Sequence, residues 1–155
     1  MPHLVIMGFG GMDQALKNYT EDNFVNSYVQ YIKAVQNLPY KPMVFLMVPI
    51  FTCSDISPAT WQEEEQKQLF TSKINCTTDQ QLDLQRIIYK IARLSDIPDH
   101  HFIDTWRLLR LNTAVPAQEY FNGDMMHPNI NGMIRIAHEI YWTMSLSPDY
   151  LHRQN

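Results

Sequence analysis

Two short, fully apolar runs separated by one amphipathic stretch set the strongest limit on how this chain folds. "LVIMGFG" spans Leu4–Gly10, and "MVFLMVPI" spans Met43–Ile50 with Pro49 near its end. Apolar runs that stop at glycine or proline are typical of strands buried on both faces. Thr20, a residue type that caps helices, precedes a helical repeat made of Phe24, Tyr28, Ile32 and Val35. The pattern predicts strand, helix and strand in that order.

The rest of the chain continues this alternation. Asp79–Leu94 is a predicted helix whose apolar face holds Leu84, Ile87, Ile88, Ile91 and Leu94. "HHFIDTW" (His100–Trp106) predicts a third strand, with pairing expected over Phe102–Asp104. The last helix is expected to bury Ile130, Ile134, Ala137, Tyr141 and Met144. Ser54–Thr78 is a polar excursion, partly helical around Trp61–Phe70. Such alternation predicts an α/β fold in which residues 1–155 form a single domain around a parallel sheet covered on both faces.

Composition narrows the classes of partner. The chain has 155 residues and a net charge of −4, which argues against nucleic acid as a partner. No apolar run is long enough to span a membrane, and Met1–Gly11 lacks the features of a secretory signal, so an intracellular location is expected. We expect no metal or cofactor, because the spacing of five histidines fits no ligand pattern; these are His3, His100, His101, His138 and His152. The adjacent pair His100 and His101 is expected at a solvated strand edge.

Candidate site residues follow the predicted strands. In open parallel sheets, ligands bind beyond the carboxyl ends of the strands. The first predicted strand leads into Gly10, Gly11, Met12 and Asp13, and the second leads into Cys53 and Ser54. The turn "NGDMMHPNING" (Asn122–Gly132) precedes the last helix and is expected at the same rim. Its Asp124 and His127 fit the acid–base end of a hydrolytic site, and they equally fit a helix-capping turn.

Two stretches resemble a known family. "PHLVIMGFGGMD" (Pro2–Asp13) resembles the third sequence block of the SGNH, or GDSL-type, ester hydrolases. "FNGDMMHPNINGMIRIAHEIYW" (Phe121–Trp142) resembles their fifth block, in which Asp-x-x-His-Pro-Asn precedes the last helix. The resemblance implies a three-layer, flavodoxin-like α/β fold. It also implies that His127 is the general base, that Asp124 orients it, and that the Gly10–Asp13 segment forms the oxyanion region. Cys53 and Ser54 would border the pocket.

The chain departs from the family pattern in ways that bear on catalysis. The family's serine-bearing first block and its glycine-bearing second block both precede the block with which this chain begins. The resemblance therefore covers only the carboxyl-terminal portion of the family's fold, and the sheet is expected to be truncated on its N-terminal side. Met12 also stands where the family has its oxyanion asparagine, and a thioether donates no hydrogen bond. We expect the chain alone not to hydrolyse esters.

The truncation also predicts a partner. Without the family's first strand, Leu4–Gly10 becomes a sheet edge with unpaired backbone groups, which invites pairing with another protein. One reading is a non-catalytic subunit of a larger assembly, which Met12 favours. The other is the carboxyl-terminal part of an esterase that binds its ester once another segment or chain supplies the serine, which Asp124 and His127 favour. Whether the chain is an enzyme stays open, although nothing local suggests that Cys53 is an activated nucleophile.

Overall fold

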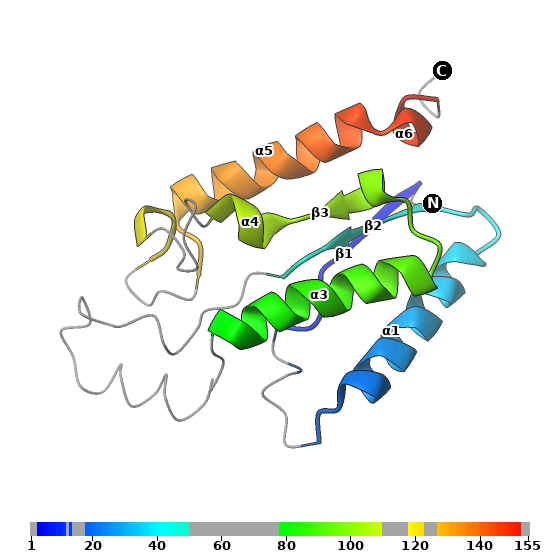
Figure 1. Cartoon of the computed structure of the whole chain (residues 1–155). Coiled ribbons are helices and arrows are strands. Elements are labelled where there is room, and N and C mark those ends of the chain that lie inside the picture. Colours follow the sequence, from blue (N-terminus) through cyan, green and yellow to red (C-terminus); the bar gives the residue numbers. More distant parts are fainter. Residues whose placement is uncertain are drawn as a thin grey trace.

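Strands and helices alternate along the described part of the chain (Figure 1). The structure is a computed structural model that describes residues 3–11, 13, 18–49, 78–109, 118–122 and 127–152. In chain order the elements are β1 (Leu4–Met7), α1 (Glu21–Gln36), β2 (Met43–Met47), α3 (Thr78–Leu94), the 3-10 helix η2 (Asp99–His101), β3 (Phe102–Ile103), α4 (Thr105–Leu109), the 3-10 helix η3 (Gln118–Tyr120), α5 (Ile130–Leu146) and α6 (Pro148–His152). The predicted excursion at Ser54–Thr78 falls almost wholly outside the described residues.

The three strands form one parallel sheet in the order β1-β2-β3, which confirms the predicted α/β class. Leu4 pairs with Met43, and Leu46 pairs with Phe102. Each strand is shorter than predicted, since β1 stops at Met7, β2 at Met47 and β3 at Ile103. Among the described residues β1 pairs with β2 alone, so its other side is an edge of the sheet.

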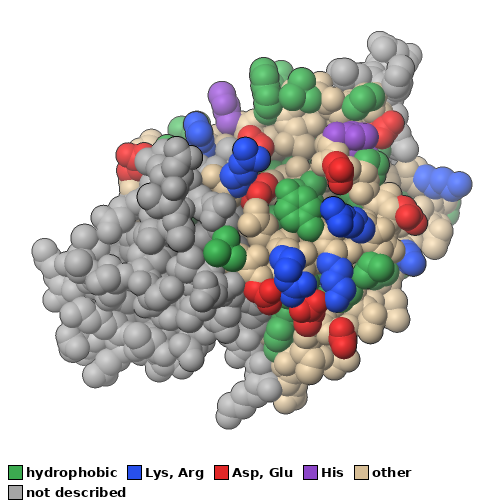
Figure 2. All heavy atoms as spheres, in the orientation of Figure 1, with side chains coloured by type: hydrophobic (Ala, Val, Ile, Leu, Met, Phe, Trp, Pro, Cys, Tyr) green, Lys and Arg blue, Asp and Glu red, His purple; other side chains and the backbone are tan. Residues whose placement is uncertain are grey.

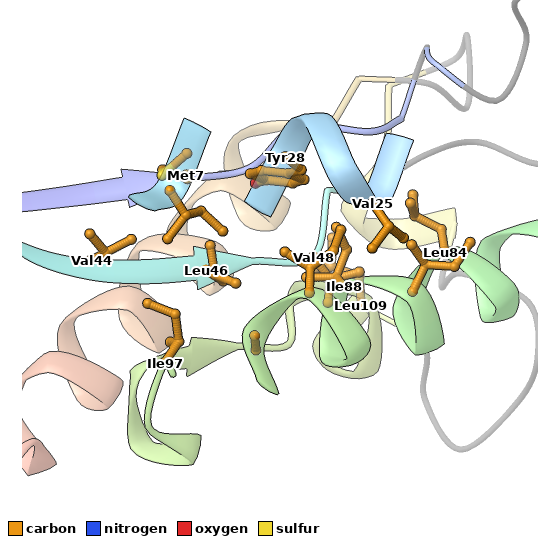
Figure 3. Close-up of a cluster of buried hydrophobic side chains, with 14 of the residues drawn as sticks. Met7, Val25, Tyr28, Val44, Leu46, Val48, Leu84, Ile88, Ile97 and Leu109 are labelled. Atoms are coloured by element: carbon orange, nitrogen blue, oxygen red, sulfur yellow. The ribbon is translucent and has the colours of Figure 1, made fainter. Parts of the chain in front are cut away.

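Helices cover both faces of this sheet. Val44 and Leu46 of β2 point into a large core under α1 and α3 (Figure 3). The intervening residues Met43 and Phe45 point to the other face, where they pack under α5. The two cores follow from strand geometry, because successive side chains of a strand point to opposite faces. None of the described helices combines the length and the apolar character that a bilayer crossing needs.

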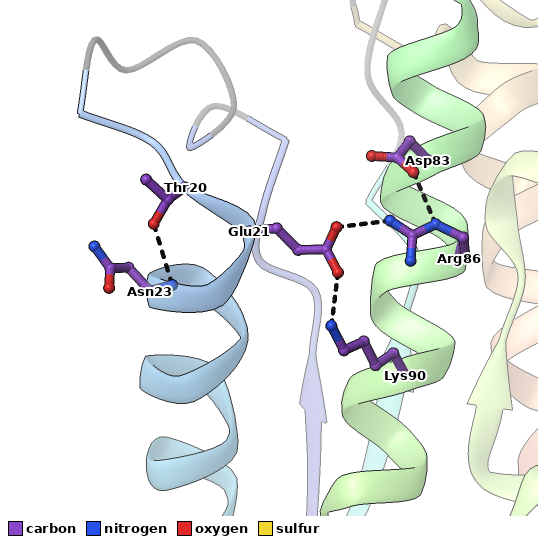
Figure 4. A network of polar contacts seen from close by, with 6 residues as sticks. All are labelled: Thr20, Glu21, Asn23, Asp83, Arg86 and Lys90. Carbon is purple, nitrogen blue, oxygen red and sulfur yellow. Dashed lines mark hydrogen bonds and ion pairs between the residues drawn. The ribbon is translucent and has the colours of Figure 1, made fainter.

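The start of α1 is fixed by polar contacts. Thr20 caps the helix as predicted, because its hydroxyl accepts a hydrogen bond from the Asn23 N–H at 3.3 Å. Glu21 contacts Arg86 and Lys90 of α3 at 2.7 Å each (Figure 4). Hydrogen bonds from Arg86 and then from Lys90 lower the pKa of the Glu21 carboxyl. Exposed ion pairs contribute little stability, so these contacts mainly set how α1 and α3 align.

The segment predicted as a strand over His100–Trp106 divides into three pieces. Only Phe102 and Ile103 pair with β2, with η2 before them and α4 after them. The carboxylate of Asp104 accepts a hydrogen bond from the Arg107 N–H at 3.0 Å, which is how an Asp caps the start of a helix. The Thr105 hydroxyl donates to the Val48 carbonyl. Capping by Asp104 therefore ends the strand earlier than its apolar pattern predicted.

The predicted buried face of the last helix is wrong. Ile130, Ile134, Ala137 and Tyr141 are exposed, and only Met144 of the predicted set is partly buried. α5 instead packs through Gly132, Ile136 and Ile140, which lie on another side of the helix. The sequence places apolar residues on both sides, so periodicity alone does not choose between them. Figure 2 shows hydrophobic side chains along the upper margin of the molecule, where α5 runs in Figure 1.

Candidate functional site

The turn before α5 is closed at its two ends by backbone contacts. Phe121 and Pro128 form an antiparallel bridge, and the Asn122 N–H donates to the His127 carbonyl at 2.9 Å. The Asn129 N–H donates to the Tyr120 carbonyl, also at 2.9 Å. The buried Phe121 ring anchors this turn in the same core as Val48 and Leu109. The end of the turn that carries His127 is therefore held in a defined position.

Asn129 organises this turn and was missed by the sequence reasoning. Its side-chain oxygen accepts hydrogen bonds from the N–H groups of Asn131 and Gly132, at 2.9 and 3.1 Å. Its side-chain amide donates to the carbonyls of Glu119 and Phe121, at 2.8 and 2.9 Å. One residue thus caps α5 and fastens the incoming chain. The sequence signal that could have identified it is an Asn directly before a helical repeat, because Asn is strongly preferred at the N-cap of a helix.

Gly132 allows the turn and α5 to approach closely. A Cβ atom at this position would lie 2.2 Å from the Tyr120 carbonyl oxygen and 3.0 Å from the Cβ of Pro128. No side chain fits at the first distance, so only glycine permits this packing. Glycine in the "HPNING" motif therefore has a structural reason, whatever the chemistry of the neighbouring His127.

The turn lies at the carboxyl end of the sheet. The hydroxyl of Ser147, just after α5, is 3.0 Å from Nε2 of His101, which precedes β3. The carboxyl end of α5 therefore lies at the amino end of β3, and α5 runs back towards α4, which follows β3 (Figure 1). His127 stands before the start of α5 and is exposed. Asp124 lies outside the described residues, so its hydrogen bond to His127 stays a prediction.

The exit of β1 is shaped by glycine and by the start of α1. Gly10 has a φ of +120°, a conformation that favours glycine, and a Cβ there would lie 2.8 Å from Phe24. The Phe9 N–H donates to the Tyr28 hydroxyl at 3.3 Å, and burial raises the pKa of Tyr28 to about 12. Gly11 is partly buried. This exit is therefore built mainly by packing against α1.

The structure describes only some of the remaining predicted site residues. Asp13 lines a surface hollow of about 220 Å³ beside the start of α1, together with Asn18, Thr20, Asn23 and Ser27. Met12, Cys53 and Ser54 lie outside the described residues. The described part of the rim thus brings together the β1 exit and α1, with the His127 turn at the same end of the sheet.

Large apolar side chains are exposed along the outside of α5, interspersed with the exposed polar residues Asn131, Arg135 and His138. Six of its side chains are each more than half exposed; they are Ile130, Met133, Ile134, Tyr141, Trp142 and Leu146. We call these six residues the outer face of α5. The inner side of α5 packs on the sheet through Ile140 and Met144, in the cluster that also includes Leu4 and Ile6 of β1. α5 therefore covers the face of the sheet to which Leu4 and Ile6 of the edge strand β1 point.

The adjacent histidines differ from the prediction. His101 is only 5% exposed and stacks on Phe45, with ring centroids 4.2 Å apart, so the pair is not a solvated strand edge. His100 is exposed and lies 3.2 Å from the carboxylate of Asp149 in α6. The sequence reasoning missed this contact because α6 is remote from His100 in the chain.

Comparison with known proteins identifies no relative of this chain. No protein-family model matches the chain, and neither a curated protein nor a solved structure matches it. The function is therefore inferred from the residues of the chain itself.

Proposed function

We propose that this chain is a non-catalytic, SGNH hydrolase-like subunit of a larger protein assembly. It would join the assembly through the outer edge of β1 and the outer face of α5. The observation that carries the proposal is the exposure of this face, since apolar surface of this kind on a folded chain marks a protein interface. The cores of protein interfaces are enriched in Tyr, Trp and Met. The outer face of α5 contains one of each, namely Tyr141, Trp142 and Met133.

The unpaired edge of β1 is a second argument for a partner at this surface. Val44, Phe45 and Leu46 of the central strand β2 are buried, whereas Leu4, Val5 and Ile6 of β1 are only partly buried. A partner that added a strand to β1 would pair its backbone groups and cover these side chains. We infer that the partner is a polypeptide that contributes a strand beside β1 and an amphipathic helix against α5.

We expect the double substitution Ile134→Glu with Tyr141→Glu to release the chain from its assembly. These side chains are 56% and 67% exposed, so the isolated chain should keep its stability to within about 0.5 kcal/mol. The measurement is the native mass of the complex that contains the chain, isolated from its own cells. The wild type should elute far above its 18.2 kDa monomer mass, and the variant should elute as a monomer.

The matched control is Tyr31→Glu with Leu94→Glu, which replaces two similarly exposed residues on α1 and α3. This control should keep the wild-type mass. A photo-crosslinker at position 134 should capture one defined protein, and the same crosslinker at position 31 should not. A wild type that is monomeric in its cells, or a double variant that stays assembled, would contradict the proposal. Crosslinking to a second copy alone would replace the separate partner with a homo-oligomer.

A second candidate is the carboxyl-terminal part of an ester hydrolase whose serine comes from another segment or chain. It is favoured by the position of the His127 turn at the end of the sheet from which Gly10 and Gly11 leave β1. Met12 speaks against it, because loss of one oxyanion donor typically slows such an enzyme by about 10²–10³-fold.

We expect the isolated chain to release acid from short-chain acyl esters no faster than its His127→Ala variant. A general base without a nucleophile and oxyanion donors supplies little of the acceleration that an esterase needs. The measurement is the hydrolysis rate of both proteins, alone and within the isolated assembly. Turnover by the chain alone that His127→Ala abolishes would overturn this expectation, and Cys53→Ala and Ser54→Ala would then identify the nucleophile. Turnover only within the assembly would favour the second candidate.

A further inference from the structure

Three side chains capable of binding a metal converge at the amino end of β3. Nε2 of His100 lies 3.2 Å from Oδ2 of Asp149, and Nε2 of His101 lies 3.5 Å from the same oxygen. One potential ligand atom from each side chain lies within 4.8 Å of the others. We propose that His100, His101 and Asp149 bind a divalent transition metal ion of the zinc type, with water as the fourth ligand.

The distances fit the size of a zinc site. Zinc binds imidazole nitrogen and carboxylate oxygen at about 2.0–2.2 Å in tetrahedral geometry, so two neighbouring ligand atoms lie roughly 3.3–3.5 Å apart. Both nitrogen–oxygen distances at Asp149 are close to this separation. The remaining distance, between the ring nitrogens of His100 and His101, shortens when the ring of His100 turns. The exposed position of His100 allows that rotation. Two imidazoles and one carboxylate also form a donor set that zinc accepts.

One ligand is already held in place. The buried ring of His101 is stacked on Phe45, and its Nε2 is 3.0 Å from the Ser147 hydroxyl. His100 meets the same ring edge-to-face, with centroids 4.7 Å apart. Ser147 is itself buried between α5 and α6, so it fixes where Asp149 enters the site. Packing on Phe45 therefore orients the ring of His101. An ion bound at Nε2 would replace the contact with Ser147, while His100 and Asp149 adjust.

Solvent reaches the site from one side. His101 and Asp149 line a hollow of about 390 Å³, together with Gln36, Met43 and Asp96. This hollow has room for a water molecule at the remaining coordination position. Bound metal would also tie η2 to α6 and thereby fix the end of the chain that follows α5. The alternative is a plain hydrogen-bonded contact in which Asp149 only docks α6 on η2.

Zinc chloride titrated into the full chain and followed by calorimetry distinguishes these readings. We expect one bound zinc ion per chain, and at least tenfold weaker binding for His100→Ala and for Asp149→Asn. Both residues are exposed, so their substitution should leave the fold intact, as circular dichroism would verify. The matched control is His138→Ala, an exposed histidine on α5, which should bind within about twofold of the wild type.

Histidine-ring nitrogen NMR shows which side chains hold the ion. Zinc should shift the Nε2 resonances of His100 and His101 and leave those of His3 and His138 unchanged. Zinc should also raise the melting temperature of the wild type but not of the two ligand variants. Equal affinity in the wild type and both ligand variants would overturn the proposal. Loss of binding in a Cys53→Ser, Cys76→Ser double variant would overturn it as well, because zinc would then sit at the cysteines.

Discussion

Gly132→Ala is expected to lower the free energy of unfolding by about 2–3 kcal/mol, although alanine normally stabilises a helix relative to glycine. The new methyl carbon would lie 2.2 Å from the Tyr120 carbonyl oxygen. That oxygen also accepts the Asn129 N–H, so it moves only if the bond that joins η3 to the start of α5 is lost. The measurement is the urea midpoint of the purified chain, followed by circular dichroism.

Two substitutions on α5 calibrate this expected loss. Asn131→Ala, one position earlier and exposed, should change the stability by no more than about 0.5 kcal/mol. Ala137→Gly, on the exposed side of the same helix, should lose about 1 kcal/mol from helix propensity alone. If Gly132→Ala were neutral or stabilising, α5 and η3 would not be in the close contact that the structure describes.

Asn129→Ala should destabilise the chain by about 2–4 kcal/mol. Loss of a helix N-cap typically costs about 1 kcal/mol. The same change removes the two side-chain donations to the carbonyls of Glu119 and Phe121, each worth about 0.5–1.5 kcal/mol. Thermal and urea unfolding of the purified variant would measure the sum.

Asn129→Asp separates the two functions of this side chain. The aspartate keeps the acceptor for the N–H groups of Asn131 and Gly132 and loses only the donated bonds. It should therefore recover about 1 kcal/mol, which is between a quarter and a half of the stability that Asn129→Ala loses. Equal losses for alanine and aspartate would show that the cap contributes nothing. Full recovery with aspartate would show the same of the two donated bonds.

The strands and the first helix were predictable because their signals are local. An apolar run that ends at glycine or proline carries its own strand boundary to within a few residues, and Thr20 marks its own helix start. The third strand was overestimated because its length depends on Asp104, which caps α4 and so competes with strand pairing. The spacing of the apolar residues does not reveal that competition.

The orientation of α5 and the histidine cluster depend on residues far apart in the chain. Helical periodicity identifies an apolar face, but α5 has two, and the contact of Gly132 with Tyr120 determines which one is buried. The meeting of His100 with Asp149 likewise requires α5 to span the sheet first. Spacing along the sequence could not reveal either arrangement. Asp124 and His127 remain a prediction from the motif.

The span of α5 makes the two ends of the molecule energetically independent. A helix of 17 residues is roughly 25 Å long, so the His127 turn and the cluster around Asp149 are separated by several shells of side chains. Free-energy changes at positions this far apart normally add, with coupling of less than about 0.5 kcal/mol. A substitution at one end therefore leaves the other end as an undisturbed internal reference.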